Sequence, residues 1–168
     1  MARVGIALGS NLGDRLANLQ AARDRLVELA RPTSEILQAP IYRTAPVLCP
    51  PDSPDFYNTV IEIELDGTPI EVLESTQRIE RDLGRASGGP RNAPRIIDVD
   101  LLYFGEISLV RDNLVLPHPQ LTRRRFVLQP LAEIRPGLCL PGSSLSIAEH
   151  LDLLTSDEPA LEVVQVTW

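Results

Sequence analysis

Two aspartates near the middle of the chain, Asp98 and Asp100, are separated by a single residue within the stretch Arg91 to Gly105. In a β-strand, residues two apart point to the same side. Their Cα atoms would lie roughly 6.5 to 7 Å apart, so both carboxylates could bind one or two hard cations, which prefer oxygen ligands. The spacing predicts a metal site, although such pairs also occur on the solvated edges of sheets.

Three arginines, Arg85, Arg91 and Arg95, precede the acidic pair in a run rich in glycine and proline. Guanidinium groups suit phosphate oxygens because they can donate two parallel hydrogen bonds. A loop of this composition could close over a bound nucleotide. Together, the acids and arginines indicate a site for a metal-bound polyphosphate, where the chemistry would be displacement at phosphorus.

The basic residues of the chain narrow this chemistry further. All 16 are arginine, and the sequence contains no lysine. A Walker-type phosphate loop requires a lysine, as do the third strand of a protein kinase and Schiff-base catalysis. Phosphate binding here must therefore depend on arginine, backbone N–H groups and metal.

The length and the net charge of the chain limit the classes of protein to which it can belong. A chain of 168 residues suits one domain, spanning 1–168. The net charge of −7 argues against a nucleic-acid partner. No apolar run approaches the roughly 20 residues of a membrane span, and the N-terminal stretch lacks the apolar core of a signal peptide. We expect a cytoplasmic protein without a membrane partner, in which Cys49 and Cys139 are free thiols.

The elements that must position the acids alternate along the chain. Apolar runs predict strands over 3–8, 36–43, 57–65 and 96–104, and helices between Asp14 and Pro32 and between Thr68 and Gly84. Because apolar residues surround the acids, we expect their strand to be central in its sheet. The order β-α-β-β-α-β is that of a ferredoxin-like α+β sandwich, an antiparallel sheet with both helices packed on one face.

The remaining segments are expected to be additions to this sandwich. Residues 107–116 are predicted to extend the same sheet, and helical patterns cover 121–134 and 146–154. The tail over 161–166 has the composition of a strand, without a predicted place. The loop over 44–54 contains four prolines, which exclude regular structure, and long loops within compact domains are often functional.

Short stretches along the chain together resemble the 6-hydroxymethyl-7,8-dihydropterin pyrophosphokinases of folate biosynthesis. In chain order they are IALGSN, YRTAP, PDFYN, TQRIE, GR, PRIIDVDLLYFG, LPHP and RRFVLQPLAEI. The resemblance runs from about residue 4 to about residue 140. It implies transfer of the β,γ-diphosphate of ATP to the hydroxymethyl oxygen of the pterin, with release of AMP and with two Mg²⁺ ions bound.

The resemblance also implies a role for particular residues. Asp98 and Asp100 would bind the Mg²⁺ ions, while Arg85 and Arg95 would hold the transferred diphosphate. The predicted ATP-side residues are Gln77, Glu80, Arg91, Leu101, His118 and Arg124. The predicted pterin-side residues are Thr44, Ala45, Val47, Phe56, Asn58 and Phe126, with the pterin stacked on Phe126. Asn92 stands where the family often has a tryptophan. We expect a monomer, with a dimer as the alternative.

Two other classes of protein fit parts of the pattern. A metal-dependent nucleotidyl- or glycosyltransferase could use the same acidic pair, and would need a site for a sugar nucleotide. A non-catalytic ferredoxin-like module that binds a ligand would account for the fold, but would leave the acids and arginines unexplained. The joint presence of the acidic pair and the loop arginines favours the pyrophosphokinase.

Overall fold

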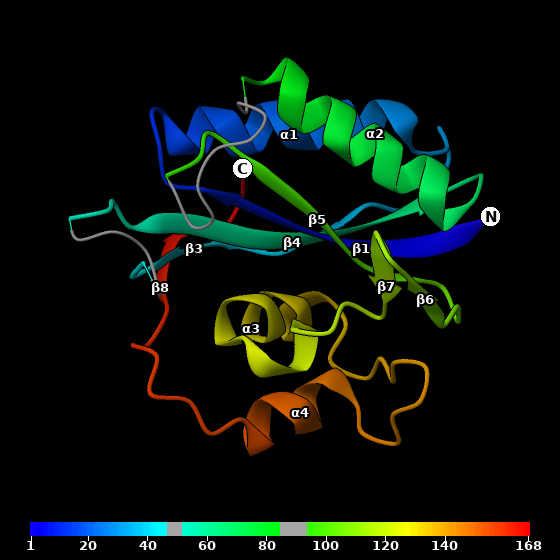
Figure 1. Cartoon of the computed structure of the whole chain (residues 1–168). Helices are drawn as coiled ribbons and strands as arrows, with labels where there is room; N and C mark the ends of the chain where they lie inside the picture. Colours follow the sequence, from blue (N-terminus) through cyan, green and yellow to red (C-terminus); the bar gives the residue numbers. More distant parts are fainter. Residues whose placement is uncertain (47–51, 85–93) are drawn as a thin grey trace.

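The computed structural model describes residues 1–46, 52–84 and 94–168. Its main sheet is antiparallel, with strands in the order β5-β1-β4-β3-β8, and the short strand β2 also pairs with β4 (Figure 1). The strands are β1 Ala2–Ser10, β2 Leu37–Gln38, β3 Ile41–Thr44, β4 Phe56–Leu65, β5 Asp98–Phe104 and β8 Glu162–Gln165. With the first two helices, β1, β3, β4 and β5 form the βαββαβ arrangement, which confirms the predicted ferredoxin-like fold.

Helices lie on both sides of this sheet (Figure 1). The helices α1 (Arg15–Leu29) and α2 (Pro69–Asp82) cover one face, as predicted. On the other side, α3 (Arg125–Ile134) packs against the sheet and α4 (Ile147–Leu153) packs against α3. The C-terminal additions therefore cover a face that would be exposed in the minimal sandwich.

Side chains at the helix ends fix where these helices begin and stop. The Asp14 carboxylate accepts a hydrogen bond from the first turn of α1. Thr68 and Glu71 form a capping box at the start of α2, as the sequence predicts, and a second box begins at Ser146 before α4. Gly84 follows α2 with a φ of +98°, a conformation that favours glycine and stops the helix.

Two apolar clusters lie on opposite faces of the sheet, and β5 contributes to both. Leu101 belongs to the cluster beneath α1 and α2, whereas Leu102 and Tyr103 belong to the cluster beneath α3. The register between β1 and β5 shifts here, because Ile6 pairs with Leu101 while Gly5 pairs with Tyr103. This bulge puts Leu102 and Tyr103 on one side. Strict alternation along the strand would instead put Tyr103 on the face of Leu101.

A buried carboxylate connects the sheet to the end of α3. Glu62 is fully buried, accepts hydrogen bonds from the Tyr103 hydroxyl at 2.6 Å and from Arg3 Nη1 at 2.9 Å, and has Arg135 Nε at 3.2 Å. Burial and the Glu62 charge raise the pKa of Tyr103. A Cβ atom on Gly5 would come within 2.1 Å of the Tyr103 ring, so this close approach requires glycine.

Two predictions about strands are wrong. The strand predicted to be central, β5, is an edge strand of the main sheet in the described part of the chain. Its apolar residues are buried because helices cover both faces, not because strands flank it on both sides. Residues 107–116 form a separate hairpin of β6 (Leu109–Arg111) and β7 (Leu114–Leu116), because Asp112 and Asn113 make a two-residue turn between strands that pair with each other.

Other differences are smaller. The predicted strand over 36–43 is divided into β2 and β3, and the helix predicted over 121–134 begins as a short 3-10 turn before α3. The unplaced tail contains β8, which pairs with β3. Cys139 is a free thiol as predicted, and Cys49 lies outside the described residues. Within the described ranges, no helix has both the length and the apolar character needed to cross a membrane.

Candidate active site

The acidic pair, Asp98 and Asp100, lies at the start of β5. Asp98 pairs with Gly9 of β1, and Asp100 pairs with Ala7, in an unbroken register. Alternation along this part of the strand puts both aspartates on the face opposite Val99, which is buried beneath α1 and α2. The structure therefore confirms that the two carboxylates share one side of a strand.

Arg95 joins this acidic pair from the segment just before β5. Its Nη1 atom donates to Asp98 Oδ1 at 2.9 Å, and both side chains are about a quarter exposed or less. Partial burial lowers the pKa of Arg95, but the hydrogen bond to Asp98 and the charges of Asp98, Asp100 and Glu80 outweigh it, so the net shift is upward. Arg95 stays charged and lies among three carboxylates.

Glu80 reaches the same place from α2. Its side chain is buried, and Oε1 accepts a hydrogen bond from the main-chain N–H of Val99 at 2.8 Å. Val99 is the residue between the two aspartates, so this hydrogen bond joins α2 to β5 at the acidic pair. This contact joins two walls of the cleft described next, beside the acids.

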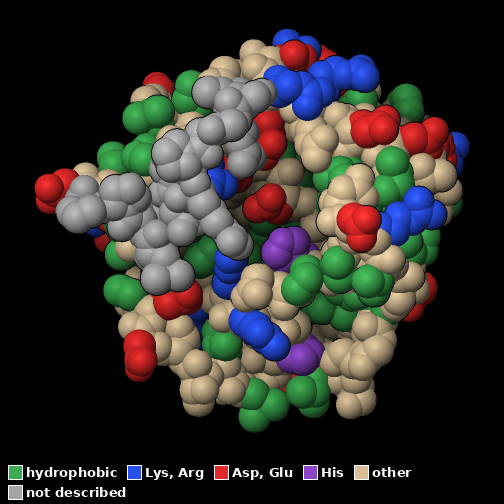
Figure 2. Space-filling view, viewed as in Figure 1, with side chains coloured by type: hydrophobic (Ala, Val, Ile, Leu, Met, Phe, Trp, Pro, Cys, Tyr) green, Lys and Arg blue, Asp and Glu red, His purple; other side chains and the backbone are tan. Residues whose placement is uncertain are grey.

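A cleft of about 430 Å³ lies between α2, β5 and the β6–β7 hairpin. Its walls include Asp100 and four of the predicted ATP-side residues: Gln77, Glu80, Leu101 and His118. On the face seen in Figure 2, acidic side chains and a histidine gather around a hollow, with arginines nearby. The structure thus brings together residues that are far apart in the sequence and that were predicted to share one ligand.

The ring of His118 is held in one tautomer at the wall of this cleft. The main-chain N–H of His118 donates to the Leu102 carbonyl at 2.7 Å, and the ring Nδ1 accepts from the Gln120 N–H at 3.1 Å. Burial, together with the charge of Arg124, lowers the pKa of His118. A neutral ring with Nδ1 as acceptor carries its proton on Nε2. The Arg124 guanidinium lies 5.6 Å from the centroid of the Phe126 ring.

Three of the predicted pterin-side residues, Thr44, Phe56 and Asn58, lie together on β3 and β4, across β1 from Asp98. Asn58 is mostly buried, and its Nδ2 donates to Thr44 Oγ1 at 2.7 Å. Phe56 precedes it on the same face of β4, and the exposed Ala45 follows Thr44. Gly9 pairs with Asn58 on one side and with Asp98 on the other. Asn58 and Asp98 therefore lie two strand spacings apart, roughly 10 Å, with Gly9 between them.

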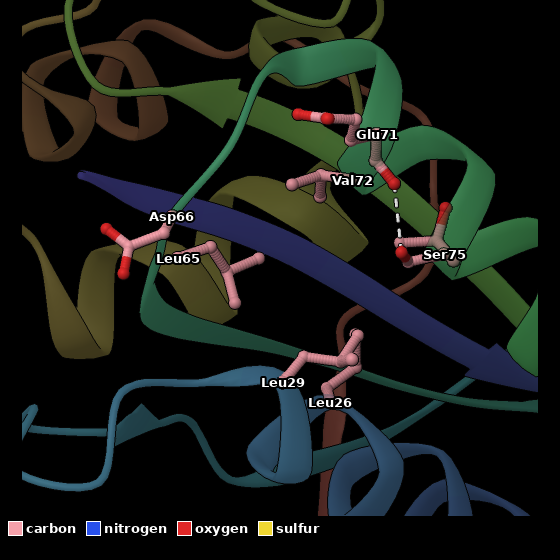
Figure 3. Close-up of a pocket in the computed structure, with 8 residues that line it drawn as sticks. Leu26, Leu29, Leu65, Asp66, Glu71, Val72 and Ser75 are labelled. Atoms are coloured by element: carbon pink, nitrogen blue, oxygen red, sulfur yellow. Dashed lines mark hydrogen bonds between the residues drawn. The ribbon is translucent and has the colours of Figure 1, made fainter.

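A second cavity, of about 130 Å³, lies between α1 and α2 (Figure 3). Leu26, Leu29 and Leu65 supply its apolar wall, and Ser75 Oγ donates to the Glu71 carbonyl within α2. Among the residues that the structure describes, none that was predicted for ATP, pterin or metal lines this cavity. Its polar groups serve the helix, so it is not the candidate active site.

Residues 5–136 match the family model of the 7,8-dihydro-6-hydroxymethylpterin-pyrophosphokinases (HPPK). The chain belongs to this family. It is 40% identical over 139 residues to the 2-amino-4-hydroxy-6-hydroxymethyldihydropteridine pyrophosphokinase of Pseudomonas aeruginosa, a match that covers 83% of this chain and 84% of the relative. It is 43% identical over 129 residues to the enzyme of the same name from Bacillus subtilis, covering 77% of this chain and 75% of that one.

Solved structures of HPPK-containing proteins share the fold. A crystal structure of Plasmodium falciparum HPPK-DHPS with pteroate superposes with a TM-score of 0.69 over 90% of this chain, at 15% sequence identity. The chain spans only 42% of that protein. At this identity the likeness concerns the fold, and it agrees with the ferredoxin-like arrangement of strands and helices.

Not every predicted HPPK site residue can be located. Arg85, Arg91 and Val47 lie outside the described residues, as does Asn92. Conversely, Gly9 and Asn11 contribute to the site without having been predicted for it. Both belong to the stretch IALGSN, where they follow the strand predicted over 3–8. Only the pairing of β1 with its two neighbours reveals that this strand end lies beneath the site.

Proposed function

We propose that this chain is a Mg²⁺-dependent pyrophosphokinase of folate biosynthesis that uses ATP as co-substrate. It would transfer the β,γ-diphosphate to the hydroxymethyl group of 6-hydroxymethyl-7,8-dihydropterin, giving AMP and the pterin diphosphate. Membership of the HPPK family supports this reaction. The observation that carries it is the position of the acidic pair, because Asp100 lines the cleft while Asp98 lies two strands from Asn58.

The donor set at β5 fits Mg²⁺. Within the described residues, no group of three or more acidic, histidine or cysteine side chains is arranged to hold a metal. Mg²⁺ is commonly bound by one or two carboxylates together with phosphate oxygens and water. Asp98 and Asp100 would supply those carboxylates. When bound, the ions would orient the phosphates and neutralise charge at the transferred group.

Arginines of the chain would stabilise the charge that develops during transfer of the diphosphate. The hydroxymethyl oxygen attacks the β-phosphorus, the bond from that phosphorus to the oxygen bridging to the α-phosphate breaks, and AMP leaves. Arg95, which stays charged beside Asp98, would offset the negative charge that develops between the β-phosphorus and the leaving oxygen. Arg85 is proposed to do the same.

Binding of the two substrates would depend on different sides of the acidic pair. On the ATP side, Gln77, Glu80, Leu101 and His118 line the cleft, and His118 would donate from Nε2; Arg91 and Arg124 are proposed to contact the phosphates. On the pterin side, Asn58 would donate to and accept from the amide edge of the ring. Phe56 and Phe126 would contact its flat faces, and main-chain groups of Thr44, Ala45 and Val47 the remaining edge.

We also propose a domain organisation, an oligomeric state and a cellular location for this protein. We propose a single domain over 1–168 that acts as a monomer, with a dimer as the alternative. Light scattering after size-exclusion chromatography distinguishes these states. Because ATP is the co-substrate, we place the enzyme in the cytoplasm, which fractionation of cells can test.

The decisive experiment is to identify the nucleotide product. Purified protein is mixed with ATP, MgCl₂ and 6-hydroxymethyl-7,8-dihydropterin, and nucleotides are separated by anion-exchange chromatography. We expect one AMP for each pterin diphosphate, no AMP without the pterin, and loss of turnover with excess EDTA. Formation of ADP would indicate an ordinary kinase, and binding of pterin without turnover would indicate a non-catalytic module; either result contradicts the proposal.

A further inference from the structure

Asn11 lies at the end of β1 and is almost fully buried, with 1% of its surface exposed. Its main-chain N–H donates to the Arg95 carbonyl at 3.1 Å, and its side-chain Oδ1 accepts from the Arg95 N–H at 2.7 Å. Its Nδ2 donates to the carbonyl of Pro54 at 3.3 Å. One buried amide therefore connects two segments that are about forty residues apart in the chain.

These two segments lead to opposite halves of the site. Arg95 precedes β5, and its guanidinium reaches Asp98 at the proposed diphosphate position. Pro54 precedes β4 and stands two residues before Phe56 on the pterin side. The hydrogen bonds of Asn11 therefore connect the main chains of the two halves.

We propose that Asn11 is a positioning residue, which sets the place of Arg95 relative to the pterin side. This inference rests on the proposed function. Reciprocal hydrogen bonds with the main chain fix both the position and the orientation of the Arg95 peptide, and so the point from which its side chain reaches the phosphate. Misplacement of a catalytic group by about 1 Å can cost about a hundredfold in rate.

The two sides do not depend on Asn11 equally. Arg15 also holds the segment before β4, because its Nη1 donates to the Asp55 carbonyl at 2.8 Å and its guanidinium lies 4.1 Å from the centroid of the Tyr57 ring. Loss of Asn11 should therefore displace Arg95 more than Pro54. The inference predicts a larger effect on kcat than on the KM for the pterin.

The test compares Asn11→Ala with Asn18→Ala. Asn18 is a matched control, because its Nδ2 donates to Ser10 Oγ at 3.2 Å and to the Leu12 carbonyl at 2.9 Å, which supports the same turn without contacting Arg95 or Pro54. We expect both variants to lower Tm. Only Asn11→Ala should lower kcat, by about 10- to 100-fold, while the Kd of an ATP analogue is unchanged. Equal kcat values for the two variants would overturn the proposal.

A double substitution separates positioning from a general loss of order. If Asn11 acts through the Arg95 side chain, Asn11→Ala should not lower kcat further in an Arg95→Ala background. If the loss of kcat in the double variant equals the product of the losses in the two single variants, the proposal is contradicted. If Asn11→Ala does not fold, Asn11→Asp serves instead, since it retains the acceptor for the Arg95 N–H and lacks the donor to Pro54. Because Arg15 still holds the segment before β4, this variant should change the KM for the pterin little and keep kcat close to that of the unmodified chain. A collapse of kcat would count against the proposal.

Failure of this inference is distinguishable from failure of the proposed function. If the unmodified chain forms no AMP from ATP and the pterin, the function is wrong and the proposal about Asn11 is wrong with it. If the unmodified chain forms AMP and Asn11→Ala behaves like Asn18→Ala, only the positioning role is wrong.

Discussion

The Oδ1 atom of Asn58 lies only 2.7 Å from the point where a Cβ atom would stand on Gly9. Gly9 has an ordinary backbone conformation, so it is required here for space and not for its torsion angles. Because Gly9 also pairs with Asp98, the glycine forms the floor between the amide proposed to bind the pterin and the carboxylate proposed to bind metal. A Cβ atom at this position would collide with the Asn58 amide.

The substitution Gly9→Ala should therefore weaken pterin binding. The new methyl group would push the Asn58 side chain aside and disturb its hydrogen bond to Thr44. Loss of one such hydrogen bond costs about 0.5–1.5 kcal/mol, so we expect the KM for the pterin to rise by up to about tenfold. Steady-state kinetics with the pterin varied at saturating ATP measure this change, and the KM for ATP should be unaffected.

Gly137→Ala provides the control for this prediction. A Cβ atom at Gly137 would have no atom within 4 Å, and its φ is not positive, so the same chemical change is made in open space. The KM for the pterin should be unchanged in this variant. Equal values in Gly9→Ala and Gly137→Ala would show that Asn58 does not bind the pterin.

The sequence predicted those features of the site that depend on local rules. The shared face of Asp98 and Asp100 follows from the alternation of a strand, and the start of α2 follows from the hydrogen bonds of Thr68 and Glu71. The ferredoxin-like order follows from the succession of elements. Each of these needs only neighbouring residues or a common topological rule, so no knowledge of distant contacts is required.

Features that depend on pairing between distant segments could not be predicted in this way. The apolar residues of β5 indicated burial, but burial by helices and burial by neighbouring strands give the same pattern, so its place at the edge was missed. The bulge at Leu102 and Tyr103 depends on Gly5 across the sheet. The position of Gly9 likewise appears only once β1 is aligned with β4 and β5, and that of Asn11 only from its hydrogen bonds to Arg95 and Pro54.

The substitution Asp98→Asn should abolish activity and leave the fold intact. The amide is similar in size but lacks the charge proposed to bind Mg²⁺, and loss of several kcal/mol of transition-state stabilisation lowers kcat by more than about a hundredfold. Circular dichroism should show an unchanged spectrum. Asp152→Asn, at an exposed position on α4, is the control and should keep full activity. Global unfolding of Asp98→Asn would instead indicate a structural role for this carboxylate.

Protonation of His118 should destabilise the protein below neutral pH. Burial and the Arg124 charge lower its pKa in the folded state, whereas the unfolded chain retains a value near 6.5. As pH falls below about 6.5, the unfolded state therefore binds more protons and the contribution of His118 to stability is lost. Urea unfolding of the unmodified chain and of His118→Gln from pH 8 to pH 5 tests this, because His150 is present in both and cancels. On acidification, the free energy of unfolding of the unmodified chain should fall relative to that of His118→Gln. A difference that does not change with pH would contradict the prediction.

The substitution Tyr103→Phe should lower stability without changing the chemistry of the site. Its hydroxyl donates to Glu62 at 2.6 Å, and its removal takes away one of the partners of that buried carboxylate, at a cost of about 1–3 kcal/mol. Tyr42→Phe is the control, because the Tyr42 hydroxyl makes a longer bond, 3.3 Å, to Glu133 and should matter less. Urea unfolding measures the stability of both variants, and kcat should equal that of the unmodified chain at a temperature where each is folded. A fall in kcat for Tyr103→Phe at equal folded fraction would mean that the buried network reaches the active site.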